Sequence, residues 1–451
     1  MKTLTSISWL LAILTLLLLP TSCSQSTEDP LTDGPQPGEP IPGAPLVTVH
    51  VAEAGTFTQR LSNPYETINL KVTGKLNGTD LRYIRELAGR DIYSKPTAGA
   101  LKYIDLSEAV IINGGETYLN TNVAHAPNPD INNISNSLPG LFLDCENLIS
   151  VKMPNHLREL RGTFMDCSSL TSVSLPEWAT NLSHAFYDCE KLSSVKIPDG
   201  VTNLSNTFEG CTSLTTIDLP KSVISLDRTF KGCTSLTTID LPESVKYWDR
   251  TFEGCTSLTS IDLPESVSSL NGIFKDCTSL TSIDLPESVR NLNDTFKGCT
   301  SLTTIDLPKS VISLDSTFYG CTSLTSVNIP GDKTSLSRCH LSNTFKDCPN
   351  LRTIRLFSPI PPIPREFPEL SDNVTIYVPK GSYMSYRETG WGDYNLMEFD
   401  AVGIDTPVQT NKAGVSEYYS IEGKLLTNPQ RGVSSVRETD GTTKKVFIQR
   451  P

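Results

Sequence analysis

Residues 251–270 read TFEGCTSLTSIDLPESVSSL, and nearly the same string begins at Thr229 and again at Thr295. Each copy carries one cysteine, and the spacing of these cysteines gives the period of the repeat. A cysteine occurs every 22 residues at positions 145, 167, 189, 211, 233, 255, 277, 299 and 321, and another at 348 follows a five-residue insertion near residues 337–340. Self-similarity at a fixed period of this length indicates a solenoid in which each repeat forms one coil.

Aligning the copies separates the positions that stay apolar from those that vary. The unit reads F-x-x-C-x-x-L-x-x-I-x-L-P-x-S-V-x-x-L. The Ile-x-Leu pair has the period of two that is typical of a short strand, and the proline after it ends the strand. Val-x-x-Leu begins a return pass, and Phe-x-x-Cys fits a tight helical or 3₁₀ turn. Stacked coils would place each apolar position over its copy in the next coil, which predicts one continuous core.

Leu-x-x-Ile-x-Leu is the central element of a leucine-rich repeat, and the fuller unit CTSLTSIDLPESVxxLxxTFxGC resembles the BspA-like (Treponema pallidum type) subclass. The resemblance covers residues 138 to about 356. Residues 70–91 resemble the N-terminal cap of such proteins from Bacteroidetes, residues 375–399 resemble the segment that closes these arrays, and residues 418–449 are similar to a short β-rich tail of exported Bacteroidetes proteins. The resemblance implies a β-rich leucine-rich repeat solenoid of ten 22-residue coils, with a small α/β N-terminal cap and a β-rich C-terminal region.

The two ends of the array need atypical caps, because the first and last coils would otherwise leave an apolar face and a strand edge open. Residues 80–90 carry an apolar stripe with helical spacing, formed by Leu81, Ile84, Leu87 and Ala88. Residues 101–106 read as a degenerate first strand, and residues 113–136 read as a polar surface loop. We expect an N-terminal cap at 47–137, the array at 138–357, a C-terminal cap at 358–400 and a short β-rich tail at 401–451.

The first residues resemble a bacterial lipoprotein signal. Lys2 precedes an apolar stretch at residues 9–19, and the signal would end at residue 22, so that Cys23 becomes the lipidated first residue. An ordinary secretory signal with a chance cysteine is the alternative. Residues 23–46 are rich in Pro and Gly and read as an extended tether. We therefore expect a surface-exposed outer-membrane lipoprotein of the cell envelope, which contacts the membrane through its lipid anchor only.

Three chemical roles compete with simple burial for the repeated cysteines. A catalytic nucleophile would be one cysteine beside a histidine, but the copies are equivalent and the five histidines are not repeated. Metal ligation would need clusters such as C-x-x-C. Disulfides suit an exported chain, yet parallel Cβ vectors one strand spacing apart exceed the roughly 3.5–4.5 Å that a bridge prefers. Small buried thiols that fill the core explain the position better, and Cys339 in the insertion stands apart as a candidate for exposure.

If Ile and Leu point inward, the residues between them line the concave face of the sheet. Five coils there pair a Ser or Thr with an Asp two residues later, and these ten residues are the candidate binding face: Thr216, Asp218, Thr238, Asp240, Ser260, Asp262, Ser282, Asp284, Thr304 and Asp306. Carboxylates about 5 Å apart repel one another. The row is therefore either a face for cations or a basic partner, or a solvated strip that was copied when the repeat was duplicated.

Aromatic side chains beside polar groups would indicate a sugar site, and the candidate binding face contains none. Trp248 stands where other copies have a core leucine, so we expect it to be packed inside. Trp178 takes the place of a small polar residue and is the candidate for an exposed ring. Four more aromatic residues are expected to form the core of the C-terminal cap: Tyr383, Tyr386, Trp391 and Tyr394.

The sequence indicates a binding protein and not an enzyme. It contains no G-x-S-x-G, H-E-x-x-H, phosphate-binding loop or dinucleotide fingerprint, so we expect no catalytic residues, no cofactor and no metal site. The formal net charge of −12 argues against nucleic acid and anionic lipid as partners. The resemblance implies adhesion to host matrix proteins or other cells, and hence a cell-surface scaffold for protein ligands. A glycan-binding surface protein and a structural envelope component are the alternatives.

Overall fold

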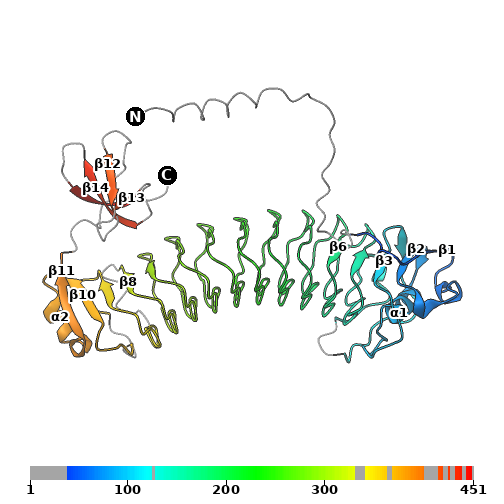
Figure 1. Cartoon of the computed structure of the whole chain (residues 1–451), viewed down its shortest axis with the longest axis horizontal. Coiled ribbons are helices and arrows are strands. Elements are labelled where there is room, and N and C mark those ends of the chain that lie inside the picture. Colours follow the sequence, from blue (N-terminus) through cyan, green and yellow to red (C-terminus); the bar gives the residue numbers. More distant parts are fainter. Residues whose placement is uncertain are drawn as a thin grey trace, which may run out of the picture. The chain divides into compact units, whose positions relative to one another are not determined.

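The structure, a computed structural model, describes residues 38–123, 127–330, 341–362, 368–400, 415–419, 425–426, 432–438 and 443–448. The predicted signal with Cys23, most of the predicted tether, and Cys339 lie outside these residues. Figure 1 shows the coils of the array stacked in one row, with residues 46–111 at one end of the stack and residues 375–399 at the other. This arrangement confirms the predicted solenoid.

Five parallel strands join the N-terminal cap to the first coils in the order β1 (Leu46–Val51), β2 (Asn69–Leu76), β3 (Tyr103–Asp105), β5 (Ser150–Lys152) and β6 (Ser172–Ser174). Ile104 of β3 pairs with Val151 of β5, so the predicted degenerate first strand is confirmed. The cap also contains β4 (Ala109–Ile111), which pairs with the end of β2, and the 3₁₀ turns η1 (Phe57–Gln59), η2 (Pro64–Glu66) and η3 (Ile134–Asn136). The sheet therefore runs from cap to array without an open edge between them.

The helix α1 (Gly78–Leu87) begins at a capping box. The Asn77 side chain accepts a hydrogen bond from the N–H of Thr79 at 3.0 Å, and the Asp80 carboxylate accepts one from the N–H of Asn77 at 3.0 Å. Asp80 also accepts from the N–H of Phe57, which ties the preceding loop to the helix start. The predicted apolar stripe is confirmed, because all four of its residues are buried: Leu81, Ile84, Leu87 and Ala88.

Two predictions about the N-terminal part of the chain need correction, one for the cap and one for the tether. Residues 113–136 are not wholly a surface loop, because Tyr118, Leu119 and Ile134 from this segment are buried in the core. The last residues of the predicted tether are also held in place. The Asn69 side chain accepts from the N–H of Ile41 at 2.8 Å and donates to the carbonyl oxygen of the same residue at 2.9 Å.

Within each coil, the Phe-x-x-Cys turn forms what we call the turn column. The ten phenylalanines from Phe142 to Phe345 are stacked with neighbouring ring centroids 5.4–6.0 Å apart. Backbone hydrogen bonds connect the same turns, for example from the N–H of Phe252 to the carbonyl oxygen of Ile273 at 3.0 Å. The turn is closed by a bond from the N–H of Cys255 to the carbonyl oxygen of Phe252, as the predicted tight turn requires.

Side-chain hydrogen bonds strengthen the turn column. The Sγ of Cys255 donates to the carbonyl oxygen of Phe230 in the preceding coil at 3.0 Å, and Thr251 Oγ1 donates to the carbonyl oxygen of Leu226 at 2.9 Å. The same thiol bond recurs from Cys167 to Cys348. The ten cysteines of the described residues are buried and free, so the predicted buried thiols are confirmed. What the sequence did not indicate is that nine of these thiols, from Cys167 to Cys348, also join two coils.

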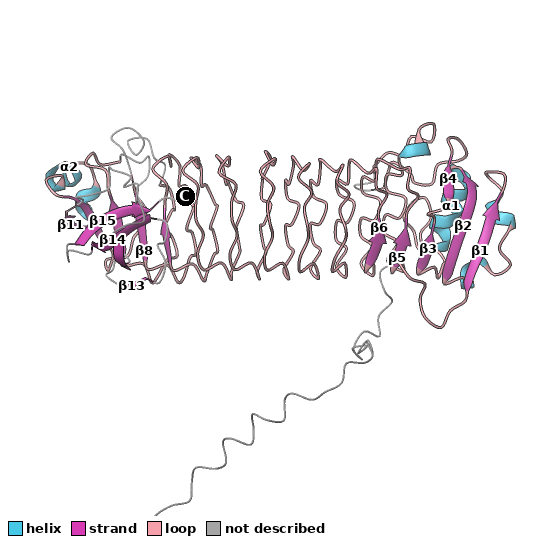
Figure 2. Ribbon diagram, turned by 90° about the horizontal axis from the view of Figure 1, so that it is seen from above, coloured by secondary structure: helices cyan, strands magenta, loops and turns pink. Residues whose placement is uncertain are grey.

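The Ile-x-Leu segments of successive coils form what we call the strand column. Its backbones pair as a β-sheet only near the two ends of the array. After β6, strand structure resumes at β7 (Thr304–Asp306), β8 (Ser326–Ile329) and β9 (Thr353–Leu356), and Figure 2 shows the loops between. The remaining backbone bonds there are long, as in the 3.5 Å from the N–H of Thr281 to the carbonyl oxygen of Thr259. The prediction of a strand in every coil is therefore wrong for the middle coils.

Charge gives a physical reason for this loss. Like charges opposite one another on neighbouring strands are destabilising. The gap spans the coil of Lys196 and the four coils that carry Asp218, Asp240, Asp262 and Asp284, so repulsion applies to the junctions between the aspartates. The ladder is re-established where Asn328 lies opposite Asp306 and its Nδ2 donates to the carboxylate at 2.7 Å.

The C-terminal cap continues the parallel sheet from β9 through β10 (Thr375–Pro379) to β11 (Asn395–Phe399). Between these strands lie α2 (Tyr383–Arg387) and the 3₁₀ turn η5 (Trp391–Asp393). A separate antiparallel sheet contains β12 (Val415–Tyr419), β13 (Leu425–Leu426), β14 (Gly432–Glu438) and β15 (Thr443–Ile448). The residues after 401 that the structure describes form strands, as the β-rich tail was predicted to do. Within the described ranges, no helix is long and apolar enough to cross a membrane.

The buried thiols predict a specific reactivity. Burial raises the pKa of Cys145 and of Cys348 to about 11, and it raises the pKa of the other array cysteines as well. In the native protein at pH 8 the ten array thiols should therefore react very slowly with a thiol reagent such as Ellman's reagent, and in denaturant without reductant all ten should react. Rapid reaction of the native array, or a count near zero in denaturant, would contradict the assignment of buried free thiols.

The same pKa shifts predict how stability depends on pH. Because the folded-state pKa lies above the unfolded value of about 8.5, the neutral thiol favours the folded state. This contribution is fully present below about pH 8.5 and is lost as the pH rises through the folded pKa values. The free energy of unfolding, measured by denaturant titration at several pH values, should fall over this window.

Candidate functional site

The ten residues of the candidate binding face all lie on the strand column and are all exposed. They alternate with buried isoleucines of the same coils, Ile217, Ile239, Ile261, Ile283 and Ile305. This alternation is the consequence of the period-two pattern, because successive side chains of an extended segment point to opposite sides. The structure therefore brings the predicted residues together on one surface over five successive coils.

The charge on this surface changes sign along the array. The Asp position is occupied by Lys152, Ser174 and Lys196 in the coils before the acidic run. After the run it is occupied by Asn328 and then by Arg355, whose guanidinium lies 5.6 Å from the ring centroid of Tyr377. The strand column thus presents an acidic centre with basic groups on both sides of it.

The prediction that this face is concave is contradicted by the hydrogen bonds. The turn column keeps coil-to-coil backbone bonds of 2.7–3.1 Å through the middle of the array, whereas the strand column there retains only bonds of 3.5 Å. Exposure agrees, because Ile217 and Ile283 are 7 % and 9 % exposed while Val327, at the same position in a paired coil, is 0 % exposed. When successive coils are further apart on one side than on the other, the side with the wider spacing is convex. The strand column is therefore on the convex side.

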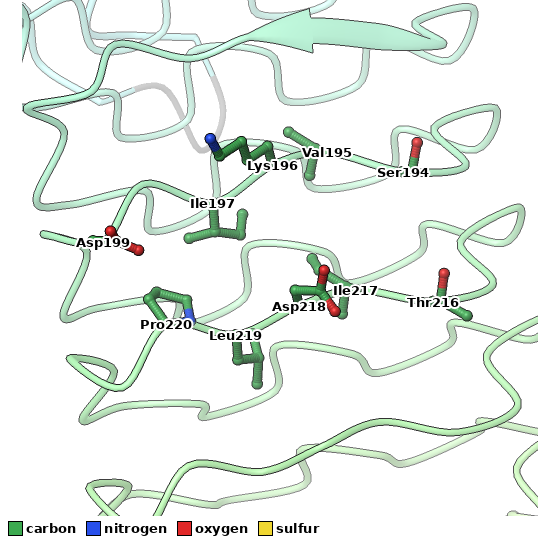
Figure 3. Close-up of a pocket in the computed structure, with 10 residues that line it drawn as sticks. All are labelled: Ser194, Val195, Lys196, Ile197, Asp199, Thr216, Ile217, Asp218, Leu219 and Pro220. Atoms are coloured by element: carbon green, nitrogen blue, oxygen red, sulfur yellow. The ribbon is translucent and has the colours of Figure 1, made fainter.

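The wider spacing opens a cleft of about 420 Å³ between two successive coils of the strand column. One coil contributes residues 194–197 with Asp199, and the next contributes residues 216–220. Figure 3 shows the side chains of Ile197 and Pro220 between the carboxylates of Asp199 and Asp218, with Lys196 at the edge of the same group. The acidic run therefore begins at a hollow with an apolar floor and charges of both signs at its rim.

The predictions for the aromatic residues are mostly confirmed. Trp178 is 65 % exposed and Trp248 is buried. In the C-terminal cap, Tyr386 and Trp391 are buried, and each donates a hydrogen bond to a backbone carbonyl. The prediction was wrong for Tyr383, which is exposed at the start of α2.

Arg355 is the residue of this face that the sequence reasoning missed. It stands seven positions after Cys348, which is the same offset that relates Asp262 to Cys255. The five-residue insertion before Cys348 moves it out of the 22-residue register, so that counting by period alone passes over it. Counting from each cysteine would have found it.

In the described part of the chain, no group of three or more His, Cys, Asp or Glu side chains could hold a metal ion.

Comparisons with known proteins agree with this architecture. A model of the BspA type leucine rich repeat region, in six copies, matches residues 98–183, 132–252 and 248–374. Among solved structures, the chain is similar to the leucine rich repeat protein of T. pallidum, at 29 % identity over 35 % of this chain and 78 % of that one, with a TM-score of 0.30. No curated protein sequence matches it.

Two further solved structures come from other bacteria. A leucine-rich repeat protein from Bacteroides ovatus is 19 % identical over 66 % of this chain and 84 % of its own, with a TM-score of 0.33. A leucine rich cell surface protein from Faecalibacterium prausnitzii is 23 % identical over 63 % and 83 %, also with a TM-score of 0.33. The family model spans more than half of the 451 residues and coincides with the stacked Phe, Cys and Leu positions. The chain belongs to the BspA-type leucine-rich repeat family.

Proposed function

We propose that this chain is a cell-surface scaffold that binds protein partners across the strand column of its array. Leucine-rich repeat proteins generally bind proteins, and the solenoid is typically a non-enzymatic scaffold. The observation that carries the proposal is the exposed row of five Asp and five Ser or Thr residues on five successive coils. Such a row offers many similar contacts to one large partner and no enclosed pocket for a small one.

The charges of the strand column define the partner. A protein with a basic patch opposite Asp218–Asp306 would meet complementary potential, and acidic groups on its flanks would meet Lys152, Lys196 and Arg355. Complementary potentials of this kind mainly raise the association rate and select the orientation. Because the groups are exposed, salt should weaken the association. A standard interface buries about 800 Å² on each partner, so contact would have to extend over several coils.

The acidic run can be tested by neutralising it. We expect the triple variant Asp240→Asn, Asp262→Asn, Asp284→Asn to bind a basic ligand among immobilised host matrix proteins at least about tenfold more weakly than the unmodified chain, which corresponds to about 1.4 kcal/mol. Surface plasmon resonance at low and high salt measures this. The control variant Glu177→Gln, Glu190→Gln, Asp372→Asn removes the same charge from exposed positions outside the row. Equal loss in both triple variants, or no binding to any matrix protein, would contradict the proposal.

The proposed location at the cell surface rests on the sequence around Cys23, which lies outside the described residues. A lipid on Cys23 would anchor the chain to the outer membrane, and the acidic Pro/Gly-rich tether would hold the array away from the bilayer. Protease treatment of intact cells should remove the array, and Cys23→Ser should release the chain from the membrane fraction. An array that intact cells protect from protease would rule out adhesion at the surface.

A further inference from the structure

One junction in the array departs from the repeat at two positions that face each other. Trp248 stands where the other coils have leucine, and in the next coil Ile273 stands where most coils have threonine. In neighbouring coils that threonine ties two coils together, as Thr251 Oγ1 does with the carbonyl oxygen of Leu226 at 2.9 Å. Ile273 has no hydroxyl group, so the carbonyl oxygen of Trp248 accepts no such bond from the next coil and is bonded only by the Oγ1 and N–H of Thr251 in its own turn. A larger side chain and a missing tie thus coincide at one junction.

The backbone opens at this junction and not at its neighbours. Bridges join Ser225 to Tyr247 and Ser269 to Asn291, but among the described residues no bridge joins Tyr247 to Ser269. The N–H groups of Trp248 and Arg250 make no backbone hydrogen bond to the next coil, whereas the equivalent N–H groups of Leu226 and Arg228 bond at 3.0 and 2.7 Å. The opening is local, because Phe252 and Phe274 stay stacked with centroids 5.7 Å apart.

The result is a cleft of about 600 Å³ on the return side of the coils, away from the strand column. Trp248 and Ile273 provide its apolar surface, and Tyr247, 58 % exposed, provides an aromatic ring that solvent can reach. Asp227, Glu243, Asp249 and Lys246 contribute three carboxylates and one ammonium group. Backbone N–H and C=O groups that pair between coils elsewhere lie along the opening. This volume is within the range of small-molecule binding sites, about 300–1,000 Å³.

We infer that this cleft binds a neutral carbohydrate. An exposed tyrosine ring beside a tryptophan offers the apolar face on which a sugar ring can stack. A sugar hydroxyl can both donate and accept a hydrogen bond, so it can pair with the backbone N–H and C=O groups that are unpaired along the opening. An apolar ligand would leave these groups without a partner. The excess of carboxylates accepts hydrogen bonds from hydroxyl groups and repels acidic sugars. The cleft is separate from the strand column, so sugar binding can be tested independently of the proposed protein binding.

Restoring the repeat provides the test. In the full chain, Trp248→Leu places the consensus residue in the coil, so the variant should fold, close the junction and show a higher Tm. The probes are neutral lactose, maltotriose and cellotriose, with sialyllactose as the anionic counterpart, and the readout is saturation-transfer NMR with titration. We expect the unmodified chain to bind at least one neutral probe and Trp248→Leu to bind it at least about tenfold more weakly. Tyr247→Ser, which places the residue of the neighbouring coils at the rim, should also weaken binding.

Trp178→Leu is the matched control, because it removes an exposed tryptophan far along the array and leaves the junction intact. Unchanged sugar binding by this variant supports the assignment. The inference is overturned if no neutral probe binds the unmodified chain, if Trp248→Leu binds as well as that chain does, or if sialyllactose binds as tightly as the neutral probe that binds best. Protein binding through the strand column should be the same in the Trp248→Leu variant and the unmodified chain, which separates this outcome from the test of the proposed function.

Discussion

The structure depends on hydrogen bonds between successive turns that carry Phe, Cys and Thr. Successive turns are joined by a backbone bond, by a thiol donated to a phenylalanine carbonyl and, in most coils, by a threonine hydroxyl donated to a leucine carbonyl, as at Phe252, Cys255 and Thr251. All of these groups are buried, so leaving any of them unpaired would cost about 1–3 kcal/mol. The turn column therefore fixes the distance between coils, and the other two sides of each coil adjust to it.

That constraint explains why function can vary on the remaining sides. The strand column carries polar residues that do not hold the coils together, and a cleft lies between the coils of Lys196 and Asp218, where the acidic run begins. On the return side, the bridges are interrupted where Trp248 and Ile273 replace the consensus residues, while the phenylalanines beneath them remain stacked. In a solenoid each coil contacts only its neighbours, so such local departures do not spread through the array.

Much of this architecture could be predicted from the sequence. The 22-residue period located the coils, the apolar positions located the core, and the helical spacing of Leu81, Ile84 and Leu87 located α1. Strand pairing was harder to predict, because Ile-x-Leu sets which side chains are buried but not how far apart the coils lie. That distance depends on the repulsion among neighbouring aspartates and on bonds made in the turn column. For the same reason the face expected to be concave has the wider spacing.

The hydrogen bonds of the buried cysteines also could not be predicted from the sequence. A 22-residue spacing shows that the thiols are equivalent, but only the stacking places each Sγ about 3 Å from a carbonyl oxygen of the coil before it. Trp248 was correctly placed in the core, yet its effect on the next coil depends on Ile273, which lies in a different copy of the repeat. Pairs of departures from a consensus in neighbouring copies are therefore the signal to look for.

Native-state hydrogen exchange with residue-level resolution tests most directly whether the turn column holds the array together. The amides of Phe208, Phe230 and Phe252, which donate to the next turn, should exchange at least about 100-fold more slowly than the amides of residues 238–241 and 260–263 on the strand column. Equal protection of the two sets, or stronger protection on the strand column, would show that a continuous sheet holds the coils and would contradict the account.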